Sequence, residues 1–400
     1  MIKFCYELFA GAGGAGCGMA QAGYTPLGGV EHHPPAADIY DLNHDLHLTR
    51  ANILDVDRIP TVDLLWASPP CQSHSIANQN RGETGNDIAL AQHVARLMVE
   101  SRPRHIAIEN VRAYGKSKSL AIIYEALVNA GYDITSSVEC AANYGAPTTR
   151  ERFIFRATLG TLGPIVQTHF NPSKTKQQEL FGEKPKWNGW WDAIAHLVDE
   201  LEPSHLTENQ VKSFENWMRK NWDLTPPLLI STANAGGNDG RENPHRHPTL
   251  TYSKPAYTIT AGGGMPKILI DGAGNKNNTD YTIRNEEQPA HTVTASHSKH
   301  PIRVLIERVG YYNGNPGTWQ PEVPSPTIRS SQHIDDKGSY RVAYNIVDGY
   351  DCYKANIKCL AAFQGFPANY NWGKNRGEAG RGIGNAVPPQ LSRAIALSFG

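Results

Sequence analysis

A single cysteine that follows two prolines is the most suggestive chemical feature of this 400-residue sequence. Residues 62–67, VDLLWA, form an apolar run typical of a buried strand in a parallel sheet. Pro69 and Pro70 must end that strand, because proline cannot donate to a β-ladder. Cys71 is therefore expected at the carboxyl edge of the sheet, where open α/β folds bind ligands. A lone cysteine is more often a small buried apolar residue, but a thiol on such a rigid turn could also act as a nucleophile.

A glycine-rich stretch, LFAGAGGAGCGMAQAG at residues 8–23, follows the first expected strand and runs into a helix. Gly11, Gly13 and Gly14 allow a tight turn and a close approach to a ligand, and the helix that follows presents free N–H groups. Glu31 lies twenty residues beyond Gly11, at the end of the next expected strand, where such folds hold ribose hydroxyls. The pattern predicts a nucleoside-bearing cofactor. NAD(P) and S-adenosylmethionine fit this spacing equally well, and a purely structural turn is the alternative.

Two further groups of polar residues are expected near the same edge. In HIAIENV, Glu109 and Asn110 end a buried strand, so Glu109 should share the sheet edge of Cys71, unless the pair only caps a helix. In YGAPTTRERFIF, Arg150 and Arg152 are two residues apart and would face one side of a strand. They point either into the cleft or to solvent.

The first 160 residues alternate apolar runs with helical patterns, which predicts a doubly wound, mostly parallel sheet. Strands are expected at 4–9, 27–31, 64–67 and 105–109. A helix at 87–101 would bury Leu90, Val94, Leu97 and Met98, and a helix at 119–130 would bury Ile123, Tyr124, Leu127 and Val128.

The amino-acid composition and the hydrophobic pattern change near residue 165. A polar segment and a short Trp-rich helix at 187–200 precede a long stretch of Gly, Asn, Thr and His with short β-type runs. Three similar phrases, KPAYTITAG from residue 254, QPAHTVTAS from 288 and VPSPTIRSS from 323, indicate a degenerate repeat of β-arches. Helical texture returns near 355, and the tail at 390–399 carries Leu391, Ile395 and Leu397, which need a core to cover. The expected organisation is an α/β domain at 1–164, a β-rich insertion at 165–355 and a C-terminal return to the first domain at 356–400.

Composition constrains the class of protein. Lys and Arg (38) balance Asp and Glu (38), so no global charge indicates a polyanionic partner, although a basic cleft is compatible with a neutral total. The six cysteines are scattered without metal-type spacing, which is typical of reduced thiols in a cytosol-like compartment. The N-terminus lacks the features of a signal peptide, and no segment has the length of a membrane span. We expect a soluble cytoplasmic protein that binds no metal and no membrane.

The ordered motifs resemble one family. FAGAGG at 9–14, Glu31, PCQ at 70–72, ENV at 109–111, RER at 150–152, QGFP at 364–367 and GNAVPP at 384–389 occur in the order found in DNA (cytosine-5) methyltransferases. The resemblance covers about the first 160 and the last 40 residues. It implies a Rossmann-like class I S-adenosylmethionine-dependent methyltransferase fold, with 1–164 as catalytic and cofactor-binding domain and 165–355 as target-recognition domain.

The resemblance also implies roles for individual residues. Cys71 would add to C6 of a flipped-out cytosine, so that C5 can attack the methyl group. Glu109 would hold N3 and the exocyclic amine, and Arg152 would bind O2 with Arg150 nearby. The implied contacts to S-adenosyl-L-methionine come from Phe9, Gly11, Gly13, Gly14, Glu31, Asn52, Ile53, Pro70, Asn385 and Val387. In the insertion, Arg241, Arg246 and Arg284 are candidate base-reading residues, although surface charge is the better interpretation of each one.

Some positions depart from the family pattern, which indicates a divergent member. Asn52 stands before Ile53 where the family has aspartate, and Asp55 is a rival for that role. Thr148 replaces a glutamine, and Cys359 and Ala362 replace an acid and an arginine.

The leading hypothesis is therefore a DNA (cytosine-5) methyltransferase acting on double-stranded DNA. We expect a monomer in a prokaryotic or phage-infected cell, acting at the nucleoid, with a cognate restriction enzyme as a candidate partner. The alternatives are the same chemistry on RNA, transfer from a modified S-adenosylmethionine donor, a non-catalytic DNA-binding relative, and a dehydrogenase built on the glycine loop.

Overall fold

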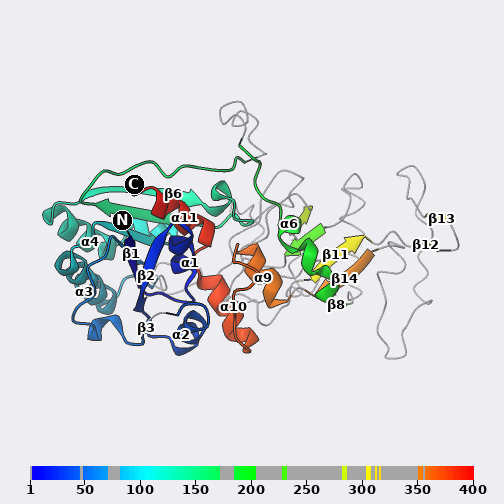
Figure 1. Cartoon of the computed structure of the whole chain (residues 1–400), viewed down its shortest axis with the longest axis horizontal. Helices are drawn as coiled ribbons and strands as arrows, with labels where there is room; N and C mark the ends of the chain where they lie inside the picture. The colour runs from blue at the N-terminus through cyan, green and yellow to red at the C-terminus, as the bar shows by residue number, and fades with distance from the viewer. Residues whose placement is uncertain are drawn as a thin grey trace.

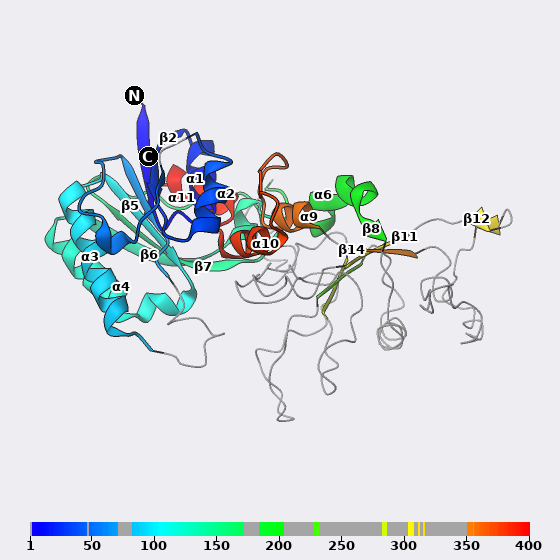
Figure 2. The ribbon, with the colours of Figure 1, turned by 90° about the horizontal axis from the view of Figure 1, so that it is seen from below.

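A computed structural model describes residues 2–45, 48–70, 82–171, 184–203, 228–231, 282–285, 303–307, 311–312, 315–316, 350–354 and 356–400. Figure 1 shows an α/β body that contains both the N-terminal and the C-terminal segments, with further strands beside it. The helices α9 and α10 lie between the body and these strands in both views (Figures 1 and 2).

The described residues of the α/β body form a seven-stranded sheet in the order β3-β2-β1-β4-β5-β7-β6. Its strands are β1 (Lys3–Leu8), β2 (Tyr24–Val30), β3 (Leu48–Thr49), β4 (Leu64–Ala67), β5 (His105–Asn110), β6 (Asp133–Cys140) and β7 (Glu151–Thr158). The first five in this order are parallel, whereas β7 runs antiparallel to both β5 and β6. The chain leaves β1 toward β2 on one side and reaches β4 on the other, so the order reverses beside β1. The prediction of a doubly wound, mostly parallel sheet is confirmed.

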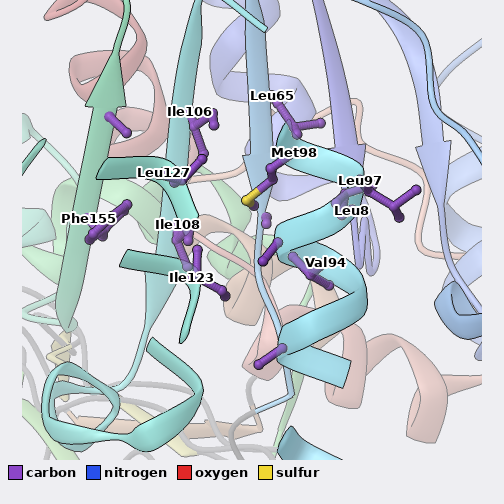
Figure 3. Close-up of a cluster of buried hydrophobic side chains, with 14 of the residues drawn as sticks. Leu8, Leu65, Val94, Leu97, Met98, Ile106, Ile108, Ile123, Leu127 and Phe155 are labelled. Atoms are coloured by element: carbon purple, nitrogen blue, oxygen red, sulfur yellow. The ribbon is translucent and has the colours of Figure 1, made fainter. Parts of the chain in front are cut away.

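Helices cover both faces of this sheet because the central strands are apolar on both sides. One face carries α3 (Gly85–Ser101) and α4 (Lys118–Asn129), which pack on Leu65, Ile106 and Ile108 (Figure 3). The other face carries α1 (Gly14–Gln21) and α11 (Pro389–Leu397), which pack on Leu64 and Trp66. Adjacent residues of β4 thus serve opposite cores, as the alternation of a strand requires.

The remaining described elements are short. The body also contains α2 (Pro34–Asp41) and the 3₁₀ turns η1 (Ile53–Asp55), η2 (Arg112–Lys116) and η3 (Ala141–Tyr144), and α9 (Ile357–Phe363) and α10 (Arg376–Asn385) lie beside it. The start of α3 is fixed by a capping box, in which Thr84 and Asp87 exchange hydrogen bonds between side chain and backbone.

The predicted helix faces were correct for α3 and partly wrong elsewhere. Val94, Leu97 and Met98 are buried, and Leu90 packs against the same cluster. In α4 the buried stripe is Leu120, Ile123 and Leu127, whereas Tyr124 and Val128 are about half exposed at 51% and 45%. In α11 Leu391 and Ile395 are buried but Leu397 is 53% exposed. In α4 and α11 fewer apolar residues are buried than the sequence contains, because a helix that lies on a sheet buries only the side that faces the sheet.

A second apolar cluster joins distant segments. Trp190 and Ile194 of α6 (Trp190–Ile194) and Leu197 of η4 (Ala195–Glu200) belong to the same core as Phe363 and Phe366. The Trp-rich segment predicted as one helix is therefore a short α-helix followed by a 3₁₀ turn. It packs on the C-terminal part of the chain.

The strands beyond the α/β body form a second, antiparallel sheet in the order β10-β9-β11-β14-β8. They are β8 (Glu202–Pro203), β9 (Leu228–Ser231), β10 (Thr282–Asn285), β11 (Arg303–Glu307) and β14 (Tyr350–Lys354), while β12 (Tyr311–Tyr312) pairs with β13 (Asn315–Pro316). The three repeated phrases, Arg241 and Arg246 lie outside the described residues, and Arg284 falls in β10. Within the described segments, none of the helices combines the length and apolar character that a membrane span requires.

Candidate functional site

The ends of three parallel strands place the predicted motifs at one edge of the sheet. Leu8 pairs with Ala67, and Ala67 pairs with Ile108, so β1, β4 and β5 end almost level. The glycine loop, the proline turn and Glu109 follow or end these strands. Cys71 lies outside the described residues, so its role as nucleophile stays a prediction.

The chain just before Cys71 is held by the neighbouring strand. Asn110 donates from Nδ2 to the carbonyl oxygen of Pro69 at 2.9 Å, and its Oδ1 accepts from the backbone N–H of Val111 at 2.8 Å. Asn110 is buried, and both ends of its amide are engaged. The second residue of the ENV motif thus fixes the turn that carries the PCQ motif.

Glu109 and Arg152 form a buried ion pair beside this turn. Arg152 Nε lies 2.8 Å from Glu109 Oε1, and both side chains are less than one-tenth exposed. Removing two charges from water is costly unless they are paired and oriented. The pair joins β5 to β7 and holds a carboxyl group and a guanidinium side by side. Such a pair can bind the polar edge of a planar heterocycle.

Arg150 has different partners from Arg152. It precedes β7 and donates from Nη1 to the carbonyl of Gly384 at 2.9 Å and from Nη2 to the carbonyl of Asn385 at 3.3 Å. These carbonyls end α10, where the helix dipole favours a cation. Arg150 therefore ties the C-terminal return to the strand that carries Arg152. The place of Arg150 near the base, beside Arg152, stays a prediction.

The glycine loop has an unusual backbone. Phe9, Gly11 and Gly13 have φ angles of 58°, 56° and 84°. A left-handed conformation costs glycine little but strains a bulky residue such as phenylalanine. The loop is held from the β2 side, because Gly11 donates its N–H to Glu31 Oε2 at 2.8 Å, while Glu31 Oε1 accepts from His33 N at 2.7 Å.

Glu7 is a buried residue of the loop region that the sequence interpretation missed. It lies in β1, is 1% exposed, and accepts the N–H of Gly16 at 2.9 Å and the hydroxyl of Tyr40 at 3.2 Å. Burial raises the pKa of Glu7 to about 8. The signal in the sequence is an acid within the otherwise apolar run of a buried parallel strand.

The C-terminal motif GNAVPP abuts the glycine loop. A Cβ atom on Gly14 would lie 2.4 Å from the carbonyl oxygen of Val387, so the two backbones are in close contact. Ser392 of α11 donates its hydroxyl to the carbonyl of Gly14 at 3.4 Å. Val387 is buried, whereas Asn385 is exposed at the end of α10.

The positions that depart from the family pattern have local explanations. Asn52 is exposed and caps η1 by accepting the N–H of Leu54 at 3.1 Å, while Ile53 is buried in the core and Asp55 is exposed. Thr148 is fully buried, and its hydroxyl has no hydrogen-bond partner among the described residues.

Cys359 and Ala362 lie at an apolar site instead of a polar one. Cys359 belongs to the cluster around Phe363, and Ala362 packs against it. Burial raises the pKa of Cys359 to about 12, so its thiol stays neutral. Across the parts of the chain that the structure describes, no three His, Cys, Asp or Glu residues are grouped to hold a metal.

Comparison with known proteins identifies relatives along nearly the whole chain. Residues 4–400 match the family described as C-5 cytosine-specific DNA methylase. The Type II methyltransferase M.AgeI of Thalassovita gelatinovora is 28% identical over 431 residues, which cover 98% of this chain and 97% of the relative. The Type II methyltransferase M.AquIA of Picosynechococcus is 31% identical over 231 residues, which cover 52% of this chain and 93% of the relative.

Solved structures share the fold. A variant of the Spodoptera frugiperda DNMT2 superposes with a TM-score of 0.54 at 13% identity over 99% of each chain. The Entamoeba histolytica methyltransferase EhMeth superposes with a TM-score of 0.51 at 11% identity, covering 100% of this chain and 98% of that one. At these identities the likeness concerns the fold alone.

Proposed function

The chain belongs to the C-5 cytosine-specific DNA methylases, and from this premise we propose that it methylates C5 of a cytosine flipped out of double-stranded DNA, using S-adenosylmethionine. Flipping is needed because the reacting atoms are not accessible within a stacked duplex. The observation that carries the proposal is the buried Glu109–Arg152 pair, 2.8 Å apart, beside a proline turn that leads into Cys71.

The proposed chemistry follows from the weakness of C5 as a nucleophile. The Cys71 thiolate adds to C6, while Glu109, which takes up a proton from solvent as the base binds, passes that proton to N3, so that the ring becomes an enamine whose C5 carries the electron density. When bound, S-adenosylmethionine supplies an electrophilic methyl group. A base then removes the C5 proton, the electron pair of that C–H bond expels the Cys71 thiolate, and N3 returns its proton to Glu109, which restores the neutral aromatic ring. Arg152 holds O2 of the base and keeps Glu109 oriented.

The glycine loop fits the cofactor. The first backbone hydrogen bond of helix α1 runs from the N–H of Cys17 to the carbonyl of Gly13, at 2.9 Å. The N–H groups of Gly14 and Ala15 precede that bond and are suited to a carboxylate. Glu31 already accepts two N–H groups, but two carboxylate oxygens offer about four lone-pair sites, so ribose hydroxyls can be added.

The remaining proposed cofactor contacts come from the loop and from segments beside it. We assign Phe9, Gly11 and Gly13 of the loop to this set, together with Asn52, Ile53, Pro70, Asn385 and Val387 from other segments. Glu31→Ala should weaken binding of S-adenosylhomocysteine, and an unchanged Kd in calorimetric titration would remove Glu31 from the site.

The family supports DNA as the substrate. We propose that this substrate is double-stranded DNA, read by a target-recognition domain within 165–355, and that the enzyme acts as a cytoplasmic monomer at the nucleoid. The relatives named above are called type II methyltransferases, which supports a cognate restriction enzyme as partner.

The decisive experiment is covalent trapping on DNA that contains 5-fluorocytosine at the target site. Genomic bisulfite sequencing in an expressing host first identifies that site. With S-adenosylmethionine the native chain should form a denaturant-stable adduct, since fluorine cannot leave as a proton, and Cys71→Ser should form none. Site-specific methylation without such an adduct would refute the covalent mechanism, and no methylation of any cytosine would refute the function.

A further inference from the structure

Aromatic side chains from two distant segments meet on the glycine loop. Tyr370 donates its hydroxyl to the carbonyl of Ala12 at 2.5 Å, and His44 Nε2 lies 3.3 Å from the same hydroxyl oxygen. Tyr370 follows the QGFP motif, and His44 lies between α2 and β3. Neither residue was singled out from the sequence.

The proton arrangement in this contact is determined by its members. A tyrosine hydroxyl has one proton, and a carbonyl oxygen can only accept. Tyr370 must therefore donate to Ala12, and His44 Nε2–H must donate to the Tyr370 oxygen. Burial raises the pKa of Tyr370 well above its usual value and lowers the pKa of His44, so a protonated phenol and a neutral imidazole are the expected forms near neutral pH.

The contact immobilises one peptide unit of the loop at both ends. The N–H of Gly13 donates to the carbonyl of Ala10 at 3.0 Å, while the carbonyl of the same peptide, on Ala12, accepts from Tyr370. His44 and Tyr370 also fill the space beside the Cα atom of Gly13, because a Cβ atom on Gly13 would lie 2.4 Å from His44 Nε2 and 2.6 Å from the Tyr370 oxygen.

Both segments are anchored to each other at the surface. Asn43 donates from Nδ2 to the carbonyl of Asn371 at 2.7 Å, and its Oδ1 accepts the N–H of Asn371 at 2.7 Å. The ring of Tyr370 packs against both Phe366 and Trp372, with ring centroids 4.8 and 5.0 Å away, and these two rings also contact each other. The neighbours on either side of the His44–Tyr370 contact are thus held by contacts within the chain itself.

We propose that Tyr370 and His44 are positioning residues for cofactor binding, which hold the Ala12–Gly13 peptide so that the first turn of α1 faces the cofactor. This role rests on the proposed function. It differs from cofactor contact, because the two side chains act through the loop backbone. Without them the loop would have to be ordered at the expense of binding free energy.

The test compares two tyrosine variants that each lose a hydroxyl–carbonyl bond. Tyr370→Phe removes the bond to Ala12 and the contact with His44, and Tyr132→Phe removes a 2.6 Å bond to the carbonyl of Pro103, which lies away from the loop. Both should lower Tm, and Tyr370→Phe should lower it somewhat more. Only Tyr370→Phe should raise the Kd for S-adenosylhomocysteine, by about tenfold, with a matching rise in KM for S-adenosylmethionine and kcat within about twofold.

A second variant covers the case in which Tyr370→Phe folds poorly. Asn43→Ala removes the two bonds to Asn371 and a 2.8 Å bond to the carbonyl of Ile39, so it should lower Tm and raise the same Kd by about threefold. If Tyr370→Phe and Asn43→Ala bind S-adenosylhomocysteine as tightly as Tyr132→Phe, the positioning role is refuted while the proposed function stands. If the unmodified chain does not bind S-adenosylhomocysteine, the proposed function and this role both fail.

Discussion

Replacing Arg150 with methionine should weaken both the fold and the cofactor site. The guanidinium is 2% exposed and donates to the carbonyls of Gly384 and Asn385. A hydrogen bond from a charged donor contributes about 1.5–3 kcal/mol, and the 3.3 Å bond to Asn385 belongs at the weak end, so the loss is about 3 kcal/mol in total. At about 2–4 °C per kcal/mol for a large domain, Tm should fall by roughly 6–12 °C.

Arg156→Met is the matched control on the same strand. Arg156 is also buried and donates from Nη1 to the carbonyl of Gly163 and to Ser398 Oγ, both at 2.7 Å. It holds the C-terminus at the end of β7 away from the site, so its loss should lower Tm to a similar extent. Only Arg150→Met should release the end of α10, and with it the Val387 carbonyl that abuts Gly14. Calorimetric titration well below both Tm values should show about tenfold weaker binding of S-adenosylhomocysteine for Arg150→Met alone.

Two outcomes would contradict this reasoning. Equal Kd values for the two variants would mean that Arg150 does not position the cofactor site. An unchanged Kd together with loss of the covalent adduct on 5-fluorocytosine DNA would instead assign Arg150 to the base, near which the family resemblance places it.

Glu109→Gln keeps the size of the side chain but removes the charge that faces Arg152. The rate of single-turnover methyl transfer should fall by about 10²–10⁴-fold, while the Kd for S-adenosylhomocysteine stays unchanged. Equal losses in transfer rate and in cofactor affinity would refute the role of Glu109. Glu7→Gln should remove a pH dependence. Because burial raises the pKa of Glu7 from 4.5 to about 8, its contribution to stability is complete below about pH 4.5 and is lost as pH rises to about 8. Urea unfolding should show the wild type losing up to about 1.4 kcal/mol per pH unit relative to the variant, and parallel pH profiles would contradict the burial argument. Deleting residues 204–355 should leave cofactor binding intact. Deleting residues 165–355 also removes α6 and exposes the apolar cluster that α6 shares with α9, so this variant should aggregate in gel filtration. If the two deletion variants behave identically in gel filtration, the shared core is refuted.

The sheet edge could be predicted from the sequence because its signals are local. Proline after an apolar run ends β4 at Ala67, where the structure ends it. Glycines mark the loop after β1, and an acid follows β2. Parallel pairing of the strands then brings these strand ends to one edge of the sheet, and this does not depend on contacts between particular side chains.

Contacts between distant side chains could not be predicted in the same way. Nothing near Tyr370 in the sequence indicates Ala12 as its partner, and Arg150 looked like Arg152 until α10 was placed beside it. The face of α4 was misjudged because apolar neighbours such as Tyr124 cannot be separated from the buried stripe without the packing partner.

The change in composition near residue 164 was used to predict a domain boundary, and the contacts of the described residues favour a later one. Thr168 and His169 donate their N–H groups to the carbonyl of Asn143, and Trp187 donates its indole N–H to the Asn143 side chain at 3.0 Å. The described residues on either side of the gap at 172–183 therefore contact the α/β body, although the composition of this segment resembles a linker. We propose that the target-recognition domain begins near residue 203, where β8 joins the second sheet.

These contacts explain how a long insertion can separate the two halves of one site. The carbonyls of Ala12 and Gly14 are held by Tyr370 and Ser392, which lie 358 and 378 residues further along the chain. Closing so long a loop costs little more than closing a short one, since each doubling of length adds only about 0.6 kcal/mol. The packing of α11 on α1 can offset that cost, because Leu391 and Ile395 are buried there. The early strands thus present the chemical groups and the late segments make them rigid, so the insertion can vary in length and sequence while the loop that faces the cofactor keeps its shape.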